Sequence, residues 1–137
     1  ITPNERESRF ALADQDSTIG GLASLLHDAT NYKNLILKLG ERGVFCSTNG
    51  QNTKDSYFSI NSFSANIADA VGAGDALLAY ATLVMLTTNS LVLAGILGSM
   101  AAACECELDG NIPIQLETVL AKIDAVEKLT NYSSNGG

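Results

Sequence analysis

The chain has 137 residues, of which 46% are hydrophobic, so it is long enough for one modest core. Its formal net charge is −7 with eight lysines and arginines, which argues against a nucleic-acid surface because such a surface needs a basic patch. A nucleotide is not excluded, since backbone amides and metal ions can hold phosphates. No apolar run reaches the length of a membrane span, so we expect no membrane contact.

The cysteines and the single histidine limit which disulfides, metal sites and catalytic triads the chain can form. Cys46, Cys104 and Cys106 fit reduced thiols of an intracellular, cytoplasmic protein better than a disulfide framework, and we expect them to be small packing residues. Because His27 is the only histidine, no histidine-based metal site or catalytic triad can be built. The chain begins with Ile1 rather than Met, which suggests a fragment or a processed protein.

The first residues predict a helix start. Thr2 is expected as the N-cap and Pro3 at the first helical position, with Glu5 reaching back as a capping box. This capping scheme leaves Asn4 and Glu7 unexplained.

The remaining elements alternate between helical and strand patterns. The first helix should end before the polar residues 14–17, and a second is expected near 21–29. We expect strands at 34–39, 44–47 and 56–60, with a glycine-containing turn at 40–43. Helices should follow at 74–86, from Ser90 onward, and at 116–129. This order indicates α/β layering in a single domain over residues 1–137.

The stretch from Asp69 to Asp75 (DAVGAGD) immediately precedes an apolar helical run. Its glycines permit a tight turn, and the unpaired N–H groups of a helix N-terminus favour an anion. Asp75, in the first turn, would lie beside that anion, an arrangement that suits phosphoryl transfer to a hydroxyl. An ordinary turn followed by an aspartate that complements the helix dipole explains the same residues structurally. Leu77 stands where a dinucleotide fingerprint needs glycine, and no Gly-Lys-Ser/Thr follows.

This stretch resembles the D-x-x-G-A-G-D signature of ribokinase-like (PfkB-type) sugar kinases. Asn4-x-x-Glu7 and Lys38-Leu39-Gly40-x-x-Gly43 likewise resemble the N-x-x-E and K-L-G-x-x-G segments of that family. The resemblance extends over almost the whole chain. It implies the C-terminal half of a ribokinase-like three-layer α/β/α fold.

The resemblance also implies roles for the residues of the signature. Asp75 would be the general base, and the backbone amides of Gly72, Ala73 and Gly74 would form the anion hole. Asp69 and the backbone of Val71 would bind a monovalent cation such as K⁺.

Other matching positions would serve the nucleotide, ATP with Mg²⁺. Gly40 and Gly43 would lie beside its phosphates and ribose, and Asn4 and Glu7 would belong to the magnesium and phosphate environment. Ser99 and Ala102 would flank the adenine pocket, where the family often carries Asn in place of Ser99. Tight helix packing explains the small residues of this helix equally well.

The implied activity is ATP-dependent phosphoryl transfer to a hydroxyl of a sugar or sugar phosphate. Ile112-Pro113-Ile114 and the amino-terminal residues are similar to heptose-7-phosphate kinases. Since the family builds its sugar pocket mostly from the N-terminal half, we expect the isolated chain to be inactive. A missing N-terminal half or a homodimer remains open as the partner. The alternatives are a nucleotide-binding or regulatory module without catalysis, and a purely structural α/β domain.

Overall fold

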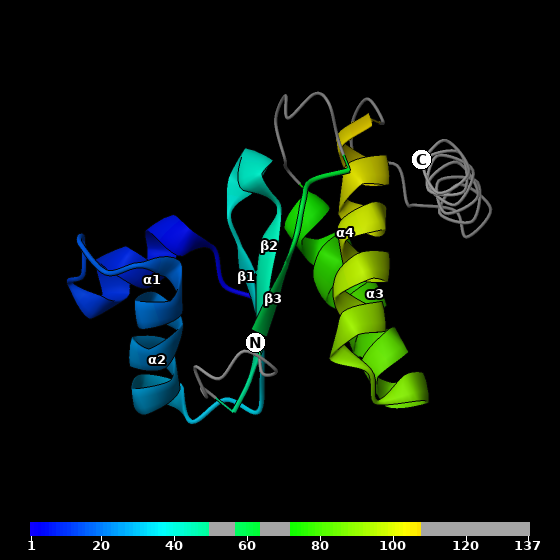
Figure 1. The fold of residues 1–137 in the computed structure, drawn as a ribbon. Coiled ribbons are helices and arrows are strands. Elements are labelled where there is room, and N and C mark those ends of the chain that lie inside the picture. The colour runs from blue at the N-terminus through cyan, green and yellow to red at the C-terminus, as the bar shows by residue number, and fades with distance from the viewer. Residues whose placement is uncertain (50–56, 64–71, 108–137) are drawn as a thin grey trace, which may run out of the picture.

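The computed structural model describes residues 1–49, 57–63 and 72–107 (Figure 1). Its elements are α1 (Glu5–Leu12), α2 (Ile19–Thr30), β1 (Asn34–Lys38), a 3₁₀ turn (Gly40–Arg42), β2 (Val44–Thr48), β3 (Tyr57–Ile60), α3 (Ala73–Thr88) and α4 (Leu91–Glu107). The predicted order of these elements is confirmed. The helix expected at 116–129 lies outside the described residues.

Among the described residues, the sheet contains three strands in the order β1-β2-β3, and both pairings are antiparallel. The residues before α1 add a short parallel partner on the other edge of β1. There the N–H of Ile36 donates to the carbonyl of Ile1, and the N–H of Lys38 donates to the carbonyl of Pro3, both at 2.9 Å. A parallel bridge between Asn4 and Lys38 ends this pairing. The start of α1 therefore lies beside the carboxyl end of β1.

Helices cover both faces of the sheet, with α1 and α2 on one side and α3 and α4 on the other (Figure 1). Leu35 and Leu37 of β1 pack into the core beneath α2, whereas Ile36 packs with residues of α3 and α4. This division follows from the two-residue period of a strand, and a strand covered on both faces needs a continuous apolar run. The three-layer α/β/α arrangement is confirmed.

Two glycines allow α4 to pack closely. A β-carbon placed on Gly98 would lie 3.1 Å from the carbonyl oxygen of Leu77 in α3. One placed on Gly95 would lie 2.9 Å from Sγ of Cys46 in β2 and 2.9 Å from Cδ1 of Ile60 in β3. At these two positions, the small side chains of α4 serve helix–helix and helix–sheet packing.

The capping scheme predicted for α1 is wrong. The N-cap is Asn4, whose Oδ1 accepts a hydrogen bond from the N–H of Glu7 at 2.7 Å, and α1 begins at Glu5. Thr2 and Pro3 instead belong to the extended segment that runs along β1, since the carbonyl of Pro3 bonds to Lys38. Strand pairing has therefore displaced the helix start that the local sequence favours.

The cysteines that the structure describes behave as packing residues. Cys46 and Cys104 are both buried, as predicted, and burial raises the pKa of the Cys46 thiol to about 12. The side chain of Cys106 lies outside the description. Within residues 1–49, 57–63 and 72–107, none of the helices is long and apolar enough to cross a membrane.

Candidate active site

The start of α3 has the backbone geometry expected of an anion-binding turn. Gly72 is the N-cap with φ of 94°, a left-handed conformation that glycine adopts without strain. The first intrahelical bond runs from the N–H of Ala76 to the carbonyl of Gly72, at 2.9 Å. Helix geometry therefore leaves the N–H groups of Ala73, Gly74 and Asp75 without acceptors inside the helix. Among the described residues, no side chain caps this helix.

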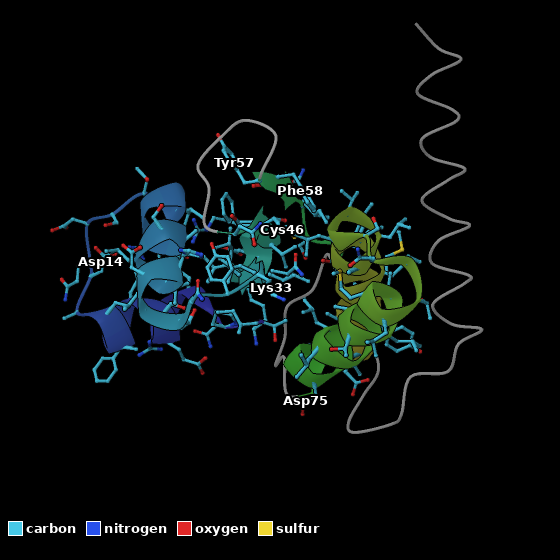
Figure 2. The ribbon with its side chains drawn as sticks, turned by 90° about the horizontal axis from the view of Figure 1, so that it is seen from below. Asp14, Lys33, Cys46, Tyr57, Phe58 and Asp75 are labelled. Carbon is cyan, nitrogen blue, oxygen red and sulfur yellow. The ribbon has the colours of Figure 1, made fainter. Side chains whose placement is uncertain are left out.

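Asp75 lies in the first turn of α3 and its side chain is exposed (Figure 2). The carboxylate is therefore accessible to a ligand at the helix start rather than turned into the core. Asp69 and Val71, predicted as cation ligands, lie outside the described residues. The structure therefore describes the signature only from Gly72 onward.

Three chain segments converge at this point. β1 ends at Lys38, the start of α1 lies beside it through the Asn4–Lys38 bridge, and α3 begins nearby. A β-carbon placed on Gly74 would lie 3.0 Å from Nζ of Lys38, so the ammonium group is next to the first turn of α3. Ligands of α/β proteins commonly bind beyond the carboxyl ends of strands, where helix N-termini gather.

The sequence named Lys38 only as the first residue of the K-L-G-x-x-G motif and gave its side chain no role of its own. In the run from Leu35 to Lys38, the two-residue period of a strand puts Lys38 on the same face as Ile36. That face is the one covered by α3 and α4.

An acidic side chain of α4 also reaches the start of α3. A β-carbon on Gly72 would lie 3.0 Å from Oε1 of Glu105. Glu105 is a second residue at this site to which the sequence assigned no role. A carboxylate here complements the positive end of the α3 dipole.

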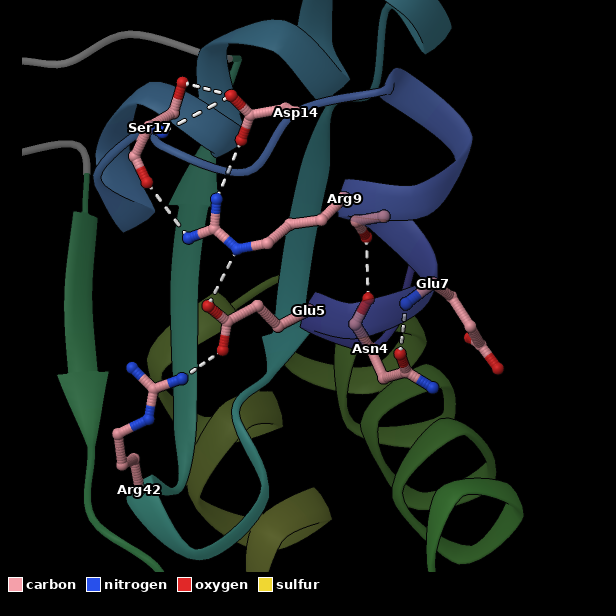
Figure 3. Close-up of polar contacts among 8 residues, drawn as sticks. Asn4, Glu5, Glu7, Arg9, Asp14, Ser17 and Arg42 are labelled. Atoms are coloured by element: carbon pink, nitrogen blue, oxygen red, sulfur yellow. Dashed lines mark hydrogen bonds and ion pairs between the residues drawn. The ribbon is translucent and has the colours of Figure 1, made fainter.

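The Asn4-x-x-Glu7 motif is partly explained by the helix it begins. Asn4 is the N-cap, and its side-chain oxygen accepts a hydrogen bond from the N–H of Glu7 (Figure 3). The side chain of Glu7 is exposed. The amide nitrogen of Asn4 and the carboxylate of Glu7 are not needed for this cap. Both groups stay predicted nucleotide-side contacts.

A charged network connects α1 to the turn after β1 (Figure 3). Arg9 donates to Glu5 at 3.0 Å and to Asp14 at 2.7 Å, and Arg42 of the turn pairs with Glu5. The Ser17 hydroxyl, which donates to Asp14, lowers the pKa of that carboxyl, and Arg9 adds to the effect. Glu5 thus joins α1 to the Gly40–Arg42 turn rather than capping α1.

The two glycines of that turn differ in how much room a side chain would have at their positions. Gly43 has φ of 88°, and a β-carbon there would lie 1.9 Å from the carbonyl oxygen of Ile60. Gly40 has φ of 64°, and no atom lies within 4 Å of a β-carbon placed on it. Backbone geometry alone accounts for Gly43, while Gly40 borders open space.

The residues predicted to flank adenine are less accessible. Ser99 is 7% exposed, and its Oγ has no hydrogen-bond partner among the described residues. Ala102 is half-buried against the core formed by the sheet, α3 and α4. The structure does not bring these two side chains to the surface beside Asp75.

A hollow at α1, within the described residues, does not coincide with the signature. A cavity of about 810 Å³ lies at α1 and the following turn, and its lining includes Arg6, Phe10 and Gln15. Asp75 is not among its lining residues.

The described residues contain no group of three or more histidine, cysteine or acidic side chains placed to hold a metal ion. The candidate site is therefore defined by backbone geometry and charge rather than by a cavity.

Comparison with known proteins identifies the family of this chain. The model of the pfkB family carbohydrate kinases matches residues 1–118, so the chain belongs to that family. Comparison with curated protein sequences finds no match.

Solved structures show the corresponding fold. The chain is similar to Arabidopsis thaliana ribokinase complexed with ribose and ATP, with a TM-score of 0.73 and 21% identity over 88% of this chain and 39% of that one. It is also similar to Thermotoga maritima ribokinase, with a TM-score of 0.71 and 27% identity over 90% and 41% of the two chains. For the ligand-free nucleoside kinase of Burkholderia thailandensis, the TM-score is 0.64 with 19% identity over 89% and 38%.

These likenesses establish a partial ribokinase-like fold. The chain spans about two fifths of the length of each of these kinases. Similarity to heptose-7-phosphate kinases stays a prediction.

Proposed function

We propose that this chain supplies the nucleotide side and the catalytic base of an ATP-dependent kinase that phosphorylates a hydroxyl of a sugar or sugar phosphate. The observation that carries the proposal is the start of α3, where amides without acceptors inside the helix and an exposed Asp75 adjoin the carboxyl end of β1. Membership of the carbohydrate kinase family supports it. A nucleoside acceptor is the second candidate, because one of the similar structures is a nucleoside kinase.

Each residue at the start of α3 has a distinct task in this mechanism. The N–H groups of Ala73 and Gly74, with that of Gly72, would donate hydrogen bonds to the transferring phosphoryl group as its charge develops. Asp75 would accept the proton of the acceptor hydroxyl. Gly72 permits the turn that precedes α3, through its left-handed backbone.

The described residues suit magnesium that arrives with the nucleotide. Mg²⁺ is usually held by one or two carboxylates together with substrate phosphates and water, so the exposed Glu7 can contribute without a preformed cluster. When bound, the ion would neutralise phosphate charge. The monovalent cation proposed for Asp69 and Val71 stays a proposal from family resemblance. Gly40, Gly43, Ser99, Ala102 and Asn4 are the proposed nucleotide contacts.

The test is Asp75→Asn in the protein at its natural length, assayed for sugar-dependent ATP turnover with a panel of sugars, sugar phosphates and nucleosides. Loss of a general base typically slows a reaction by about 10²–10⁴-fold. Since Asp75 is exposed, we expect thermal stability and ATP affinity to be retained. Asp28→Asn changes an exposed aspartate of a different helix, α2, and should leave turnover unaltered.

The same panel separates the proposal from its alternatives. Unchanged turnover in Asp75→Asn removes this residue from the mechanism. ATP binding without turnover of any acceptor favours a regulatory nucleotide-binding module. If the protein binds no ATP, the result favours a purely structural α/β domain.

A further inference from the structure

The turn between β1 and β2 is held to the rest of the chain differently at its two ends. Gly43 packs against the backbone of β3, where a β-carbon would lie 1.9 Å from the carbonyl oxygen of Ile60. At the other end, Gly40 borders open space. Among the ion pairs of the described residues, only the pair of Arg42 with Glu5 joins this turn to a helix (Figure 3).

Glu5 uses both of its carboxylate oxygens for arginines of different segments. Its Oε1 accepts from Nε of Arg9, one turn further along α1, at 3.0 Å, and its Oε2 accepts from Arg42. Arg9 is itself fixed, because it also donates to Asp14 at 2.7 Å and to the carbonyl of Ser17 at 3.0 Å. The position of Glu5 is therefore set by α1 and the loop after it, and Arg42 is tied to that position.

We propose that the Glu5–Arg42 ion pair positions the turn after β1 for the nucleotide, an inference that rests on the proposed function. Glu5 directly follows Asn4, a proposed nucleotide contact, and Arg42 lies two residues from Gly40, another such contact. The pair thus connects the two segments that would contact the nucleotide. An ion pair with an exposed partner contributes little to the free energy of folding, and Arg42 is 58% exposed. Its effect therefore falls on where the turn lies.

The decisive variant is Glu5→Gln, which keeps the shape of the side chain and removes its charge. Charge alone predicts tighter ATP binding by this variant, because a carboxylate repels phosphates. Positioning predicts the opposite, and we expect ATP affinity to fall about three- to tenfold, as when a hydrogen bond is lost. Calorimetric titration of the protein at its natural length with ATP measures the change. An affinity equal to or above that of the wild type overturns the inference.

Two replacements of Arg42 test the other half of the pair. Arg42→Gln should weaken ATP binding by the same factor as Glu5→Gln, and Arg42→Lys should restore most of the affinity because it keeps the charge. The combined variant Glu5→Gln with Arg42→Gln should bind ATP no more weakly than either single variant. Multiplicative losses would mean that Arg42 contacts the nucleotide directly, which contradicts a positioning role.

Asp14→Asn and Glu41→Gln are the matched controls. Asp14→Asn breaks the other end of the same network, so it should lower the midpoint of thermal unfolding but change ATP affinity less than about twofold. Glu41→Gln removes an exposed charge from the turn itself and should also change ATP affinity less than about twofold, since exposed charges are screened. An equal loss of ATP affinity in Asp14→Asn and Glu5→Gln would indicate general destabilisation and overturn the inference.

Hydrogen exchange tests the turn without any nucleotide. The N–H groups of Arg42 and Gly43 donate hydrogen bonds within the turn, at 3.4 and 3.0 Å. They should exchange several-fold faster in Glu5→Gln than in the wild type or in Asp14→Asn. Unchanged exchange would show that the ion pair does not hold the turn and would overturn the inference. Wild-type protein that binds no ATP overturns the proposed function, whereas faster exchange in Glu5→Gln would still show that the pair holds the turn.

Discussion

Gly72 and Gly74 belong to the same signature, yet the backbone requires glycine only at the first. Gly72 has φ of 94°, whereas Gly74 lies within α3 with ordinary helical geometry. A side chain in the left-handed region costs about 1–2 kcal/mol, and one at Gly72 would also press on Glu105 at 3.0 Å. The first glycine is therefore a folding requirement, whereas the second leaves space for Nζ of Lys38.

We predict opposite effects on stability for the two substitutions. Gly72→Ala should lower the free energy of unfolding by about 1–2 kcal/mol. Gly74→Ala should leave it unchanged or raise it by up to about 1 kcal/mol, since alanine favours a helix. Urea denaturation of both variants measures the difference. Equal destabilisation would mean that Gly74 is also constrained by the fold.

Cys46 gives a second prediction at the residue scale. Because burial raises the pKa of its thiol to about 12, the neutral form predominates at pH 8 and reacts slowly with iodoacetamide. Mass spectrometry should find Cys46 alkylated only after urea is added. The raised pKa also means that stability from this thiol is intact below pH 9 and declines as the pH rises toward 12. Rapid alkylation of the folded protein would contradict this.

At the scale of elements, the Asn4-x-x-Glu7 motif has a direct part in the fold, because it begins α1. Asn4 is the N-cap of α1, and its side-chain oxygen accepts a hydrogen bond from the N–H of Glu7. Replacing an asparagine cap by alanine typically costs about 1 kcal/mol. We predict that loss for Asn4→Ala, while Asn4→Ser should retain most of the stability because serine also caps helices.

The serine variant separates the capping role of Asn4 from its proposed contact with a nucleotide. It keeps an oxygen for the cap but removes the amide nitrogen that could contact a nucleotide. Thermal denaturation together with ATP titration should show retained stability and weaker binding. Unchanged ATP affinity would leave Asn4 a purely structural residue.

The packing of α4 gives a second prediction at this scale. Gly95 lies against Cys46 and Ile60, and a β-carbon added to it would lie 2.9 Å from a side-chain atom of each. Overpacking a filled core typically costs about 1–3 kcal/mol, so Gly95→Val should destabilise the protein by that amount. Val92→Ala, which shortens an exposed side chain of the same helix, should have little effect in the same denaturation measurement.

At the scale of the whole molecule, the chain spans about two fifths of the kinases whose fold it shares. We therefore predict that the 137-residue chain by itself turns over no ATP with any sugar, even where it binds the nucleotide. Bound ATP at about 100 times its dissociation constant should still add about 2.7 kcal/mol to the free energy of unfolding. Thermal denaturation with and without ATP, followed by a turnover assay, tests both statements. Sugar-dependent turnover by this chain would contradict the first.

Local patterns in the sequence determined much of this protein. The apolar period of residues 34–38 and 44–48, the glycines between them and the helical runs after Ala73 and Ser90 produce the elements that the structure contains. Short-range chemistry is enough here, because strand period, turn glycines and helix periodicity depend on neighbouring residues alone. The DAVGAGD stretch similarly indicates its turn and the carboxylate that follows.

Only the tertiary structure decided which groups meet. Pairing of Ile1–Pro3 along β1 moved the α1 cap from Thr2 to Asn4, a choice between local and long-range hydrogen bonds that no local pattern encodes. The approach of Lys38 to Gly74 and of Glu105 to Gly72 joins residues far apart in the chain. These contacts depend on how helices pack across a sheet, which is why the charges around the candidate site could not be read from the motif.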